Sequence, residues 1–241
     1  MIRKLKNKLG FLANTPVHPQ WLLGDRKKNI TPMINEIGEG RIVLDIGCSD
    51  KWPKQCLLSS CTYVGLDYYE TAQNWYGTKP DVYGDALCLP MKPSCFDVVL
   101  LLDVLEHIKD TDRLLHQIRT VLKPNGLMIV SIPFMYPLHD EPRDFIRLTV
   151  YGVEELASRN GFTVDTCNIS GSPIITSTIL LNIALTKLVI NWISGKSIAS
   201  VFSILLPFAI TVNNLVAKTI SLFEREDGFM PHSYQFILRK M

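Results

Sequence analysis

The chain has 241 residues, and 47% of them are hydrophobic. This length suits one domain with an elaboration better than two independent domains, and a formal net charge of only +2 argues against nucleic acid as a partner. The six cysteines include no C-x-x-C pair and no histidine spacing typical of zinc, so we expect free thiols in a reducing compartment and no metal site.

The N-terminus is basic but lacks the continuous apolar run of a secretory signal. Ile2, Leu5, Leu9 and Leu12 recur at helical spacing, with four cations mostly between them. This pattern is typical of a short helix on an anionic membrane surface, and a frayed, solvated terminus is the alternative. We expect a cytoplasmic protein, either peripheral to a membrane or free of it, in which residues 1–40 form a helical lead-in.

From residue 41 to about residue 170, short β-type apolar runs alternate with longer helical patterns. This alternation predicts a Rossmann-like α/β fold, with a mostly parallel seven-stranded sheet and helices on both faces. The expected strands are 41–46, 62–66, 82–84, 97–102, 126–132, 162–169 and 233–240. Helices are expected at 110–122, followed by a stop and turn at 123–126, and at 149–160, with Thr149 as cap. The core would then comprise residues 41–170 and 229–241.

Acidic residues close four of these strands. Asp45 with Gly47 follows the first, Asp67 the second, Asp85 the third and Asp103 the fourth. Ligands of open parallel sheets bind beyond the carboxyl ends of the strands, and Asp67 lies where an acid meets a ribose in nucleotide-binding folds. Taken singly, each acid is more often a turn or helix-capping residue. Their order and spacing together favour a cofactor site.

At these positions the chain resembles the class I S-adenosylmethionine-dependent methyltransferases, especially the broad group with an L-D-I-G-C-G start and a V-L-E-H element. The matching pieces are 43–49, 63–67, 84–90, 95–100, 103–108 and 121–132, so the resemblance covers residues 41 to about 165. It implies S-adenosylmethionine as the cofactor and methyl transfer as the reaction.

The resemblance also implies how the strand ends hold this cofactor. Asp45 and the backbone around Gly47 and Ser49 would hold its methionine part, Asp67 the ribose hydroxyls, and Asp85 the adenine. The turn after the fourth strand would line the methionine and the transferable methyl group. The implied cofactor-binding positions are Asp45, Gly47, Cys48, Ser49, Asp67, Tyr68, Asp85, Ala86, Leu102, Asp103 and Val104.

Ser49 departs from the family pattern, which usually has a second glycine there. A positive φ at a residue that carries a Cβ costs ~1 kcal/mol, which would weaken cofactor binding without abolishing it. This departure keeps an alternative open: an inactive methyltransferase-like scaffold or a membrane-bound binding protein. A nicotinamide enzyme ranks lower, because Gly47 supplies only the first glycine of G-x-G-x-x-G.

Residues 133–147, after the fifth strand, are dense in titratable and aromatic groups and would arch over the methyl group. His139 is the candidate general base, because an imidazole titrates near neutrality, although a structural loop histidine is the more frequent case. Arg143 and Arg147 would bind an acidic group of the acceptor, or pair with Asp140 and Asp144. The expected acceptor is a small molecule, a glycan or a lipid-linked group.

Residues 171–228 form an apolar insertion before the last strand. No acidic residue occurs from Thr166 to Phe223, and weaker or polar positions recur every three or four residues along 178–191 and 198–222. This spacing predicts two amphipathic helices with wide apolar faces, joined near residues 194–196.

Three roles compete for this insertion: it lies in a membrane interface, it forms a homodimer contact, or it spans the bilayer. The polar stripe, Lys187 and Pro207 argue against a lipid-surrounded span. Acid depletion and scattered lysines favour the interface of an anionic membrane. Dimerisation and additional core packing are the alternatives.

Overall fold

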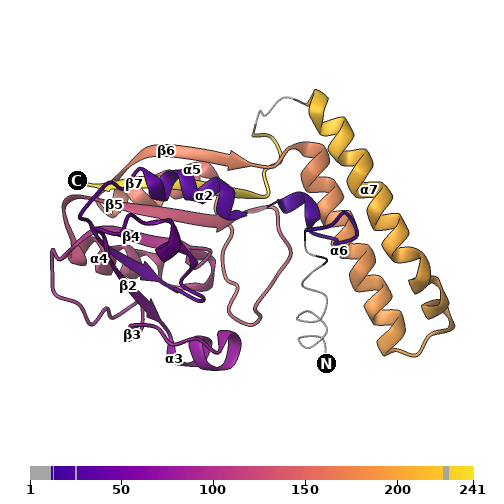
Figure 1. Ribbon diagram of the computed structural model, residues 1–241, viewed down its shortest axis with the longest axis horizontal. Coiled ribbons are helices and arrows are strands. Elements are labelled where there is room, and N and C mark those ends of the chain that lie inside the picture. Colours follow the sequence, from indigo (N-terminus) through magenta and orange to yellow (C-terminus); the bar gives the residue numbers. More distant parts are fainter. Residues whose placement is uncertain (1–11, 13, 25, 225–227) are drawn as a thin grey trace. The chain divides into compact units, whose positions relative to one another are not determined.

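The computed structural model describes residues 12, 14–24, 26–224 and 228–241 (Figure 1). The helix expected over the first residues lies outside these ranges. Two compact units divide the chain. Of the described residues, those up to residue 26, with 135–137 and those within 170–232, form the hairpin unit, and residues 27–134, 138–169 and 233–241 form the sheet unit. Residues 27–40, grouped above with the lead-in, therefore belong with the sheet.

The sheet unit contains a seven-stranded sheet with the order β3-β2-β1-β4-β5-β7-β6. Its strands are β1 (Ile42–Ile46), β2 (Thr62–Asp67), β3 (Val82–Tyr83), β4 (Phe96–Leu102), β5 (Leu122–Pro133), β6 (Phe162–Ser170) and β7 (Ser233–Lys240). Strands β1 to β5 pair in parallel, and β7 runs antiparallel to β5. The predicted fold class is confirmed, and all six cysteines are free.

One strand boundary was predicted wrongly. The sequence indicated a turn at 123–126, but β5 already begins at Leu122, directly after the preceding helix. Asn125 still adopts a positive φ of 59°, and the pairing with β4 shifts register between Phe96 and Val98. The Pro-Asn-Gly sequence therefore makes an irregular strand start rather than a separate loop.

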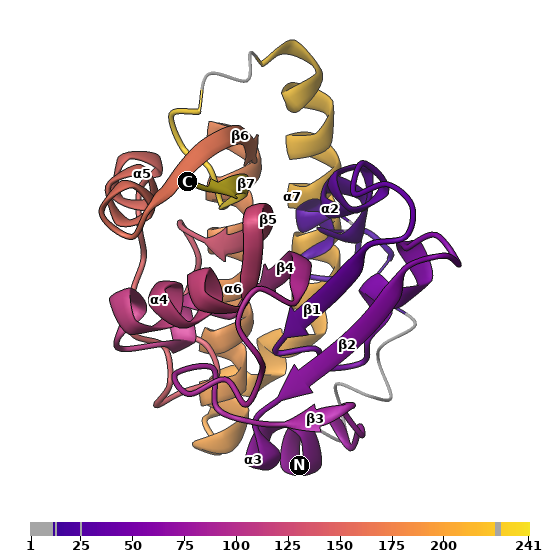
Figure 2. The ribbon, with the colours of Figure 1, turned by 90° about the vertical axis from the view of Figure 1, so that its left-hand side faces the viewer.

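Helices cover both faces of the sheet, which Figure 2 shows nearly edge-on. They are α2 (Arg26–Asn35) on one face and α4 (Thr111–Val121) and α5 (Val150–Arg159) on the other. The short helix α3 (Tyr69–Thr71) follows β2. Along β4, Val99 and Leu101 join the apolar core under α4 and α5, whereas Val98 and Leu100 join the core under α2. Thr149 caps α5 as predicted, because its hydroxyl accepts a hydrogen bond from the Gly152 N–H at 3.1 Å.

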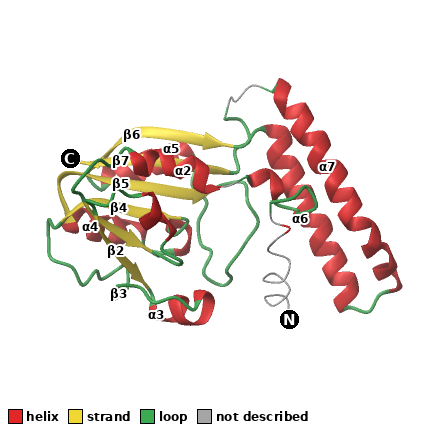
Figure 3. Cartoon of the chain, in the orientation of Figure 1, coloured by secondary structure: helices red, strands yellow, loops and turns green. Residues whose placement is uncertain are grey.

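The hairpin unit is built on two long helical segments that pack side by side (Figure 3). These are α6 (Pro173–Ser194) and a 3₁₀ segment, Ile198–Leu205, that continues into α7 (Leu206–Ile220). The 3₁₀ turns Trp21–Leu23 and Ser221–Phe223 belong to the same unit. Ser172 caps α6 by accepting from the Ile175 N–H, and Glu224 accepts from the Ile174 N–H at 3.0 Å. The pair of apolar helices before the last strand is thus present.

Within this unit, two asparagine side chains are fully buried, although many large apolar side chains are exposed. Asn182 and Asn214 are both 0% exposed. The Asn182 amide donates to Asn214 Oδ1 at 2.9 Å, and the Asn214 amide donates to the carbonyl oxygens of Pro16 and His18. The polar stripe that argued against a lipid-surrounded hairpin therefore lies partly inside it.

The outward apolar surface of the hairpin unit is extensive. Its exposed members are Leu181, Leu188, Ile190, Ile193, Ile198, Val201, Phe202, Ile204, Leu205, Phe208, Val212, Leu215, Val216, Ile220, Leu222 and Phe223. Both Pro173–Ser194 and Ile198–Phe223 are long and apolar enough to cross a membrane. At 1.5 Å per residue, α6 is about 33 Å long, against ~30 Å for a hydrocarbon core.

Candidate active site

The order in which the chain adds strands to the sheet changes direction between β1 and β4. Strands β2 and β3 lie on one side of this point, and β5 lies on the other. Open α/β sheets bind ligands at such a point, beyond the carboxyl ends of the strands. The loops after β1 and β4 pack closely at this point. A Cβ added to Gly47 would lie only 2.5 Å from Val104 Cγ2. Glycine is therefore the residue that fits at position 47.

The loop after β1 is bound tightly to the end of β2. The N–H groups of Gly47 and Cys48 both donate to the carbonyl oxygen of Leu66, at 2.8 and 3.1 Å. Gly47 has a φ of 73°, and Ser49 adopts the positive φ considered above, at 44°. The loop keeps the glycine-like backbone although position 49 carries a Cβ.

Replacing Ser49 by glycine is expected to leave stability unchanged or to raise it by up to ~1.5 kcal/mol. Relief of a left-handed conformation gives back ~1–2 kcal/mol, and the added freedom of the unfolded chain costs ~0.4–1 kcal/mol. Ser49→Val should instead destabilise the protein, because a β-branched residue tolerates positive φ poorly. Urea unfolding of the three proteins measures this, and a valine variant as stable as the wild type would contradict the interpretation.

Asp67, at the end of β2, holds the same loop from its other side. Its Oδ2 accepts from the Ser49 N–H at 3.0 Å, and its Oδ1 accepts from the Tyr68 N–H at 2.8 Å. Burial raises the pKa of the Asp67 carboxyl, and the two backbone donors partly oppose this rise. A carboxylate oxygen accepts more than one hydrogen bond, so these contacts leave capacity for the ribose hydroxyls that the sequence assigns to Asp67.

Asp45, on β1, is 2% exposed, and Tyr63 donates its hydroxyl to Asp45 Oδ2 at 2.5 Å. Burial raises the pKa of this carboxyl to about 7, with a further contribution from Asp67. Ionised Asp45 is therefore costly unless a cation lies nearby. The amino group of the methionine part of a cofactor would supply that charge at the place the resemblance implies.

The raised pKa of Asp45 predicts how stability depends on pH. The pKa of Asp45 is near 7 in the folded protein and near 4 in the unfolded chain. Its stabilising contribution to the free energy of unfolding is therefore fully present below about pH 4 and is lost as the pH rises to about 7. The loss reaches about 4 kcal/mol at most. Asp45→Asn keeps the shape and an acceptor for Tyr63 without the charge. The free energy of unfolding, measured with urea, should fall less between pH 5 and pH 7.5 for the variant than for the wild type. An equal fall for both proteins would contradict the raised pKa of Asp45.

Asp85 and Ala86 follow β3. Asp85 Oδ1 accepts from the Leu87 N–H at 2.8 Å, and its carbonyl accepts from the Cys88 N–H at 2.9 Å. This is the turn-forming role that a single acid most often has. The exposed Asp85 side chain and the buried Ala86 remain candidates for the adenine contact.

The turn after β4 is fixed by Asp103, which has a φ of 54°. Its N–H donates to the carbonyl of Ser131, and its Oδ1 accepts from the Ser131 hydroxyl at 2.8 Å. A non-glycine residue in this conformation beside a ligand site is often functional. The turn presents Leu102, Asp103 and Val104 beside the loop that contains Gly47.

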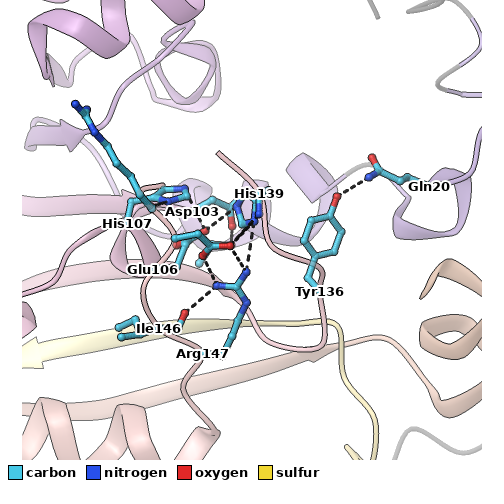
Figure 4. Close-up of polar contacts among 11 residues, drawn as sticks. Gln20, Asp103, Glu106, His107, Tyr136, His139, Ile146 and Arg147 are labelled. Carbon is cyan, nitrogen blue, oxygen red and sulfur yellow. Dashed lines mark hydrogen bonds and ion pairs between the residues drawn. The ribbon is translucent and has the colours of Figure 1, made fainter. Parts of the chain in front are cut away.

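Beyond this turn, Glu106 forms a cluster with His107 and His139 (Figure 4). Glu106 is 0% exposed, and neither of its carboxyl oxygens has a hydrogen-bond partner among the described residues. His107 Nε2 lies 3.8 Å and His139 Nε2 lies 3.6 Å from Glu106 Oε1. His139 is a residue predicted from the sequence, whereas Glu106 is not; the signal for Glu106 is an acidic residue that follows the apolar pair Val104-Leu105.

His139 is also held from its Nδ1 side. This nitrogen lies 3.3 Å from Asp144 Oδ2, and the His139 N–H donates to the same oxygen at 2.9 Å. Arg147 donates to both oxygens of Asp144, at 2.5 and 2.7 Å, and holds the pKa of that carboxyl down at about 2. The predicted Arg147–Asp144 pair is present, whereas Arg143 pairs with Glu70 at 2.6 Å.

Residues 44–130 match the family described as methyltransferase domain, and the sheet order and strand ends agree with the fold of the class I S-adenosylmethionine-dependent methyltransferases. S-adenosylmethionine is the cofactor of this family.

Curated relatives and solved structures agree with this class. A sterol 24-C-methyltransferase of Clavispora lusitaniae is 31% identical over 130 residues, which are 49% of this chain and 35% of that protein. A malonyl-acyl-carrier-protein O-methyltransferase of Xylella fastidiosa is 29% identical over 111 residues, 46% of this chain and 37% of that protein. The chain thus spans little more than a third of the length of these relatives. A structure of a methyltransferase from Archaeoglobus fulgidus covers 89% of this chain and 92% of its own, with a TM-score of 0.55 at 16% identity, and shows the fold alone.

Proposed function

We propose that this protein transfers a methyl group from S-adenosylmethionine to a small-molecule, glycan or lipid-linked acceptor at a membrane surface. The observation that carries the proposal is the site between β1 and β4, where Gly47 approaches Val104 and buried Asp45 and Asp67 follow the neighbouring strands. Asp45, Asp67 and Asp85 would hold the methionine part, the ribose and the adenine.

The protein's contribution to this reaction is positioning. The sulfonium of the cofactor is an activated methyl donor, so orienting an acceptor in line with the methyl group accounts for most of the acceleration. A general base is required only where the acceptor must lose a proton. His139 is the candidate, because Asp144 lies at its Nδ1 and leaves Nε2 as the nitrogen to receive a proton.

The hairpin unit supports the membrane part of the proposal. A helical pair with buried asparagines and outward leucine, isoleucine and phenylalanine suits an apolar environment better than water. Lys187, Lys196 and Lys218 are exposed, and no acidic residue occurs from Thr166 to Phe223, which suits an anionic lipid surface. The names of the two curated relatives, for a sterol and an acyl carrier, support a lipid-like acceptor.

Calorimetric titration of the full chain with S-adenosylmethionine tests the first half of the proposal. We expect one site per chain, and a folded sample that does not bind would refute it. Incubation with methyl-labelled cofactor and either a lipid extract or a polar extract then tests the acceptor. Label should enter the lipid extract. Cofactor binding without label in either extract would favour the inactive scaffold that Ser49 keeps open.

A further inference from the structure

The cluster of Glu106, His107 and His139 has an arrangement that cofactor binding does not explain. A carboxylate with 0% exposure and two unbonded oxygens is costly in a protein interior. One oxygen of Glu106 is approached by one nitrogen from each imidazole, and the three ligand atoms lie within 4.8 Å of one another. The cluster therefore concentrates electron-pair donors around a common point.

The other nitrogen of His107 has a partner that fixes the tautomer. His107 Nδ1 lies 2.5 Å from the carbonyl oxygen of Arg143. A carbonyl can only accept a hydrogen bond, so Nδ1 carries the proton, and Nε2 of the neutral ring presents its lone pair toward Glu106.

The same argument applies to His139. Its Nδ1 lies 3.3 Å from Asp144 Oδ2, and a carboxylate oxygen can only accept a hydrogen bond. Arg147 Nη2 also lies within hydrogen-bond distance of this nitrogen, at 3.4 Å. In the tautomer whose Nδ1–H donates to Asp144, Nε2 of His139 faces Glu106 as an electron-pair donor, and this is the form that would bind a metal ion.

We propose that Glu106, His107 and His139 bind a divalent transition-metal ion, with Zn²⁺ as the first candidate. Ligand atoms ~2.1 Å from a tetrahedral zinc lie roughly 3.4 Å apart, close to the 3.6 and 3.8 Å observed here. Metal-bound histidines typically donate their second ring N–H to a backbone carbonyl or a carboxylate. Arg143 and Asp144 provide one of each.

The proposed site lies next to the expected position of the methyl group. Glu106 is three residues beyond Asp103, in the 3₁₀ turn Leu105–His107. The side chains of His107 and His139 are 22% and 28% exposed, so the histidine side of the site is accessible. With a metal ion on its Nε2, His139 would no longer act as a general base. An open coordination position of the metal would instead bind an acceptor oxygen and favour its deprotonation. The metal site itself does not depend on the acceptor or on methyl transfer.

Metal binding is measured directly, without an activity assay. The full chain is stripped with a chelator and dialysed against Zn²⁺ and, separately, Mn²⁺ and Co²⁺, and the bound metal is determined by elemental analysis. We expect one equivalent per chain for at least Zn²⁺. His107→Ala and His139→Ala should each weaken binding roughly 10- to 100-fold, whereas His116→Ala, an exposed histidine on α4, should not change it.

Glu106→Gln provides a second, independent measurement. Without metal it should be at least as stable as the wild type, because it removes a buried carboxylate that has no hydrogen-bond partner among the described residues. With Zn²⁺ present, the wild type should gain thermal stability that the variant does not gain. Substoichiometric metal in the wild type, or equal binding by the wild type and both histidine variants, would overturn the proposal. The latter result would assign any bound zinc to the free thiols.

Discussion

Asp67→Ala is expected to weaken the affinity for S-adenosylmethionine roughly 10- to 150-fold, measured by calorimetric titration at neutral pH. The expectation corresponds to ~1.5–3 kcal/mol for hydrogen bonds to a charged group. Asp67 is placed at the end of β2, beside the loop that contains Gly47. Its carboxylate would accept from both ribose hydroxyls, and the alanine variant has no acceptor to offer them.

A matched control separates the ribose contact from the support that Asp67 gives to the loop. Asp67 also accepts from the N–H groups of Ser49 and Tyr68, so the alanine variant should lose some stability. Asp67→Asn retains one acceptor and should lose less affinity. Asp112→Ala is the control. It removes an exposed acid on α4 that pairs with Arg159 on α5, and it should leave the affinity for S-adenosylmethionine unchanged. Wild-type affinity in a folded Asp67→Ala variant would mean that the ribose lies elsewhere.

The sheet, and the strand ends that carry the proposed cofactor positions, could be predicted because their signals are local. Each strand is a short apolar run closed by an acid or a glycine, and parallel pairing then brings the strand ends to one edge. Even the unusual backbone of Ser49 could be anticipated, because the family pattern requires a glycine-like turn there. The start of β5 was predicted wrongly: Pro124 and Asn125 indicate a loop, but the strand already begins at Leu122, which pairs with Phe96 of β4, and regular pairing resumes at Leu127 with Val98.

The cluster around Glu106 could not be predicted because its parts meet only through tertiary structure. His107 and His139 are 32 positions apart in the chain, which matches no zinc-binding spacing. They meet because the segment after β5 folds back, with the Phe145 N–H donating to the carbonyl of Glu106 at 2.8 Å. That same contact brings Asp144 to the other side of His139.

The hairpin illustrates a different limit. Periodicity identifies which residues share a face of a helix, but it does not say which face points outward. For a chain surrounded by water, the polar stripe would be assigned to the outside, yet Asn182 and Asn214 pair in the interior of the unit. Buried polar pairs between helices with apolar outer faces are typical of helices in lipid. The environment, rather than the sequence pattern, decides the orientation.

Substituting Ile198, Ile204 and Phe208 together by serine is expected to abolish binding to anionic liposomes in a flotation assay. All three side chains are exposed on the hairpin unit, and Ile198 is 94% exposed. Each such side chain gains ~1.5–3 kcal/mol on leaving water. Loss of the three apolar side chains should weaken the binding free energy to liposomes by more than ~4 kcal/mol, which is about a thousandfold in the partition coefficient between water and membrane. The full chain should float with the liposomes, and a version that lacks residues 174–222 should not.

Tyr151→Ser is the matched control for this triple variant, because Tyr151 is 79% exposed on α5 in the sheet unit and its loss should leave flotation intact. The triple variant leaves the asparagine pair of the hairpin in place, so it tests the apolar surface more directly than the deletion does. Equal behaviour of the wild type and both altered hairpins would contradict the membrane proposal. A wild type that does not float but sediments as a dimer, which the serine substitutions dissociate, would assign the same surface to a second copy of the chain.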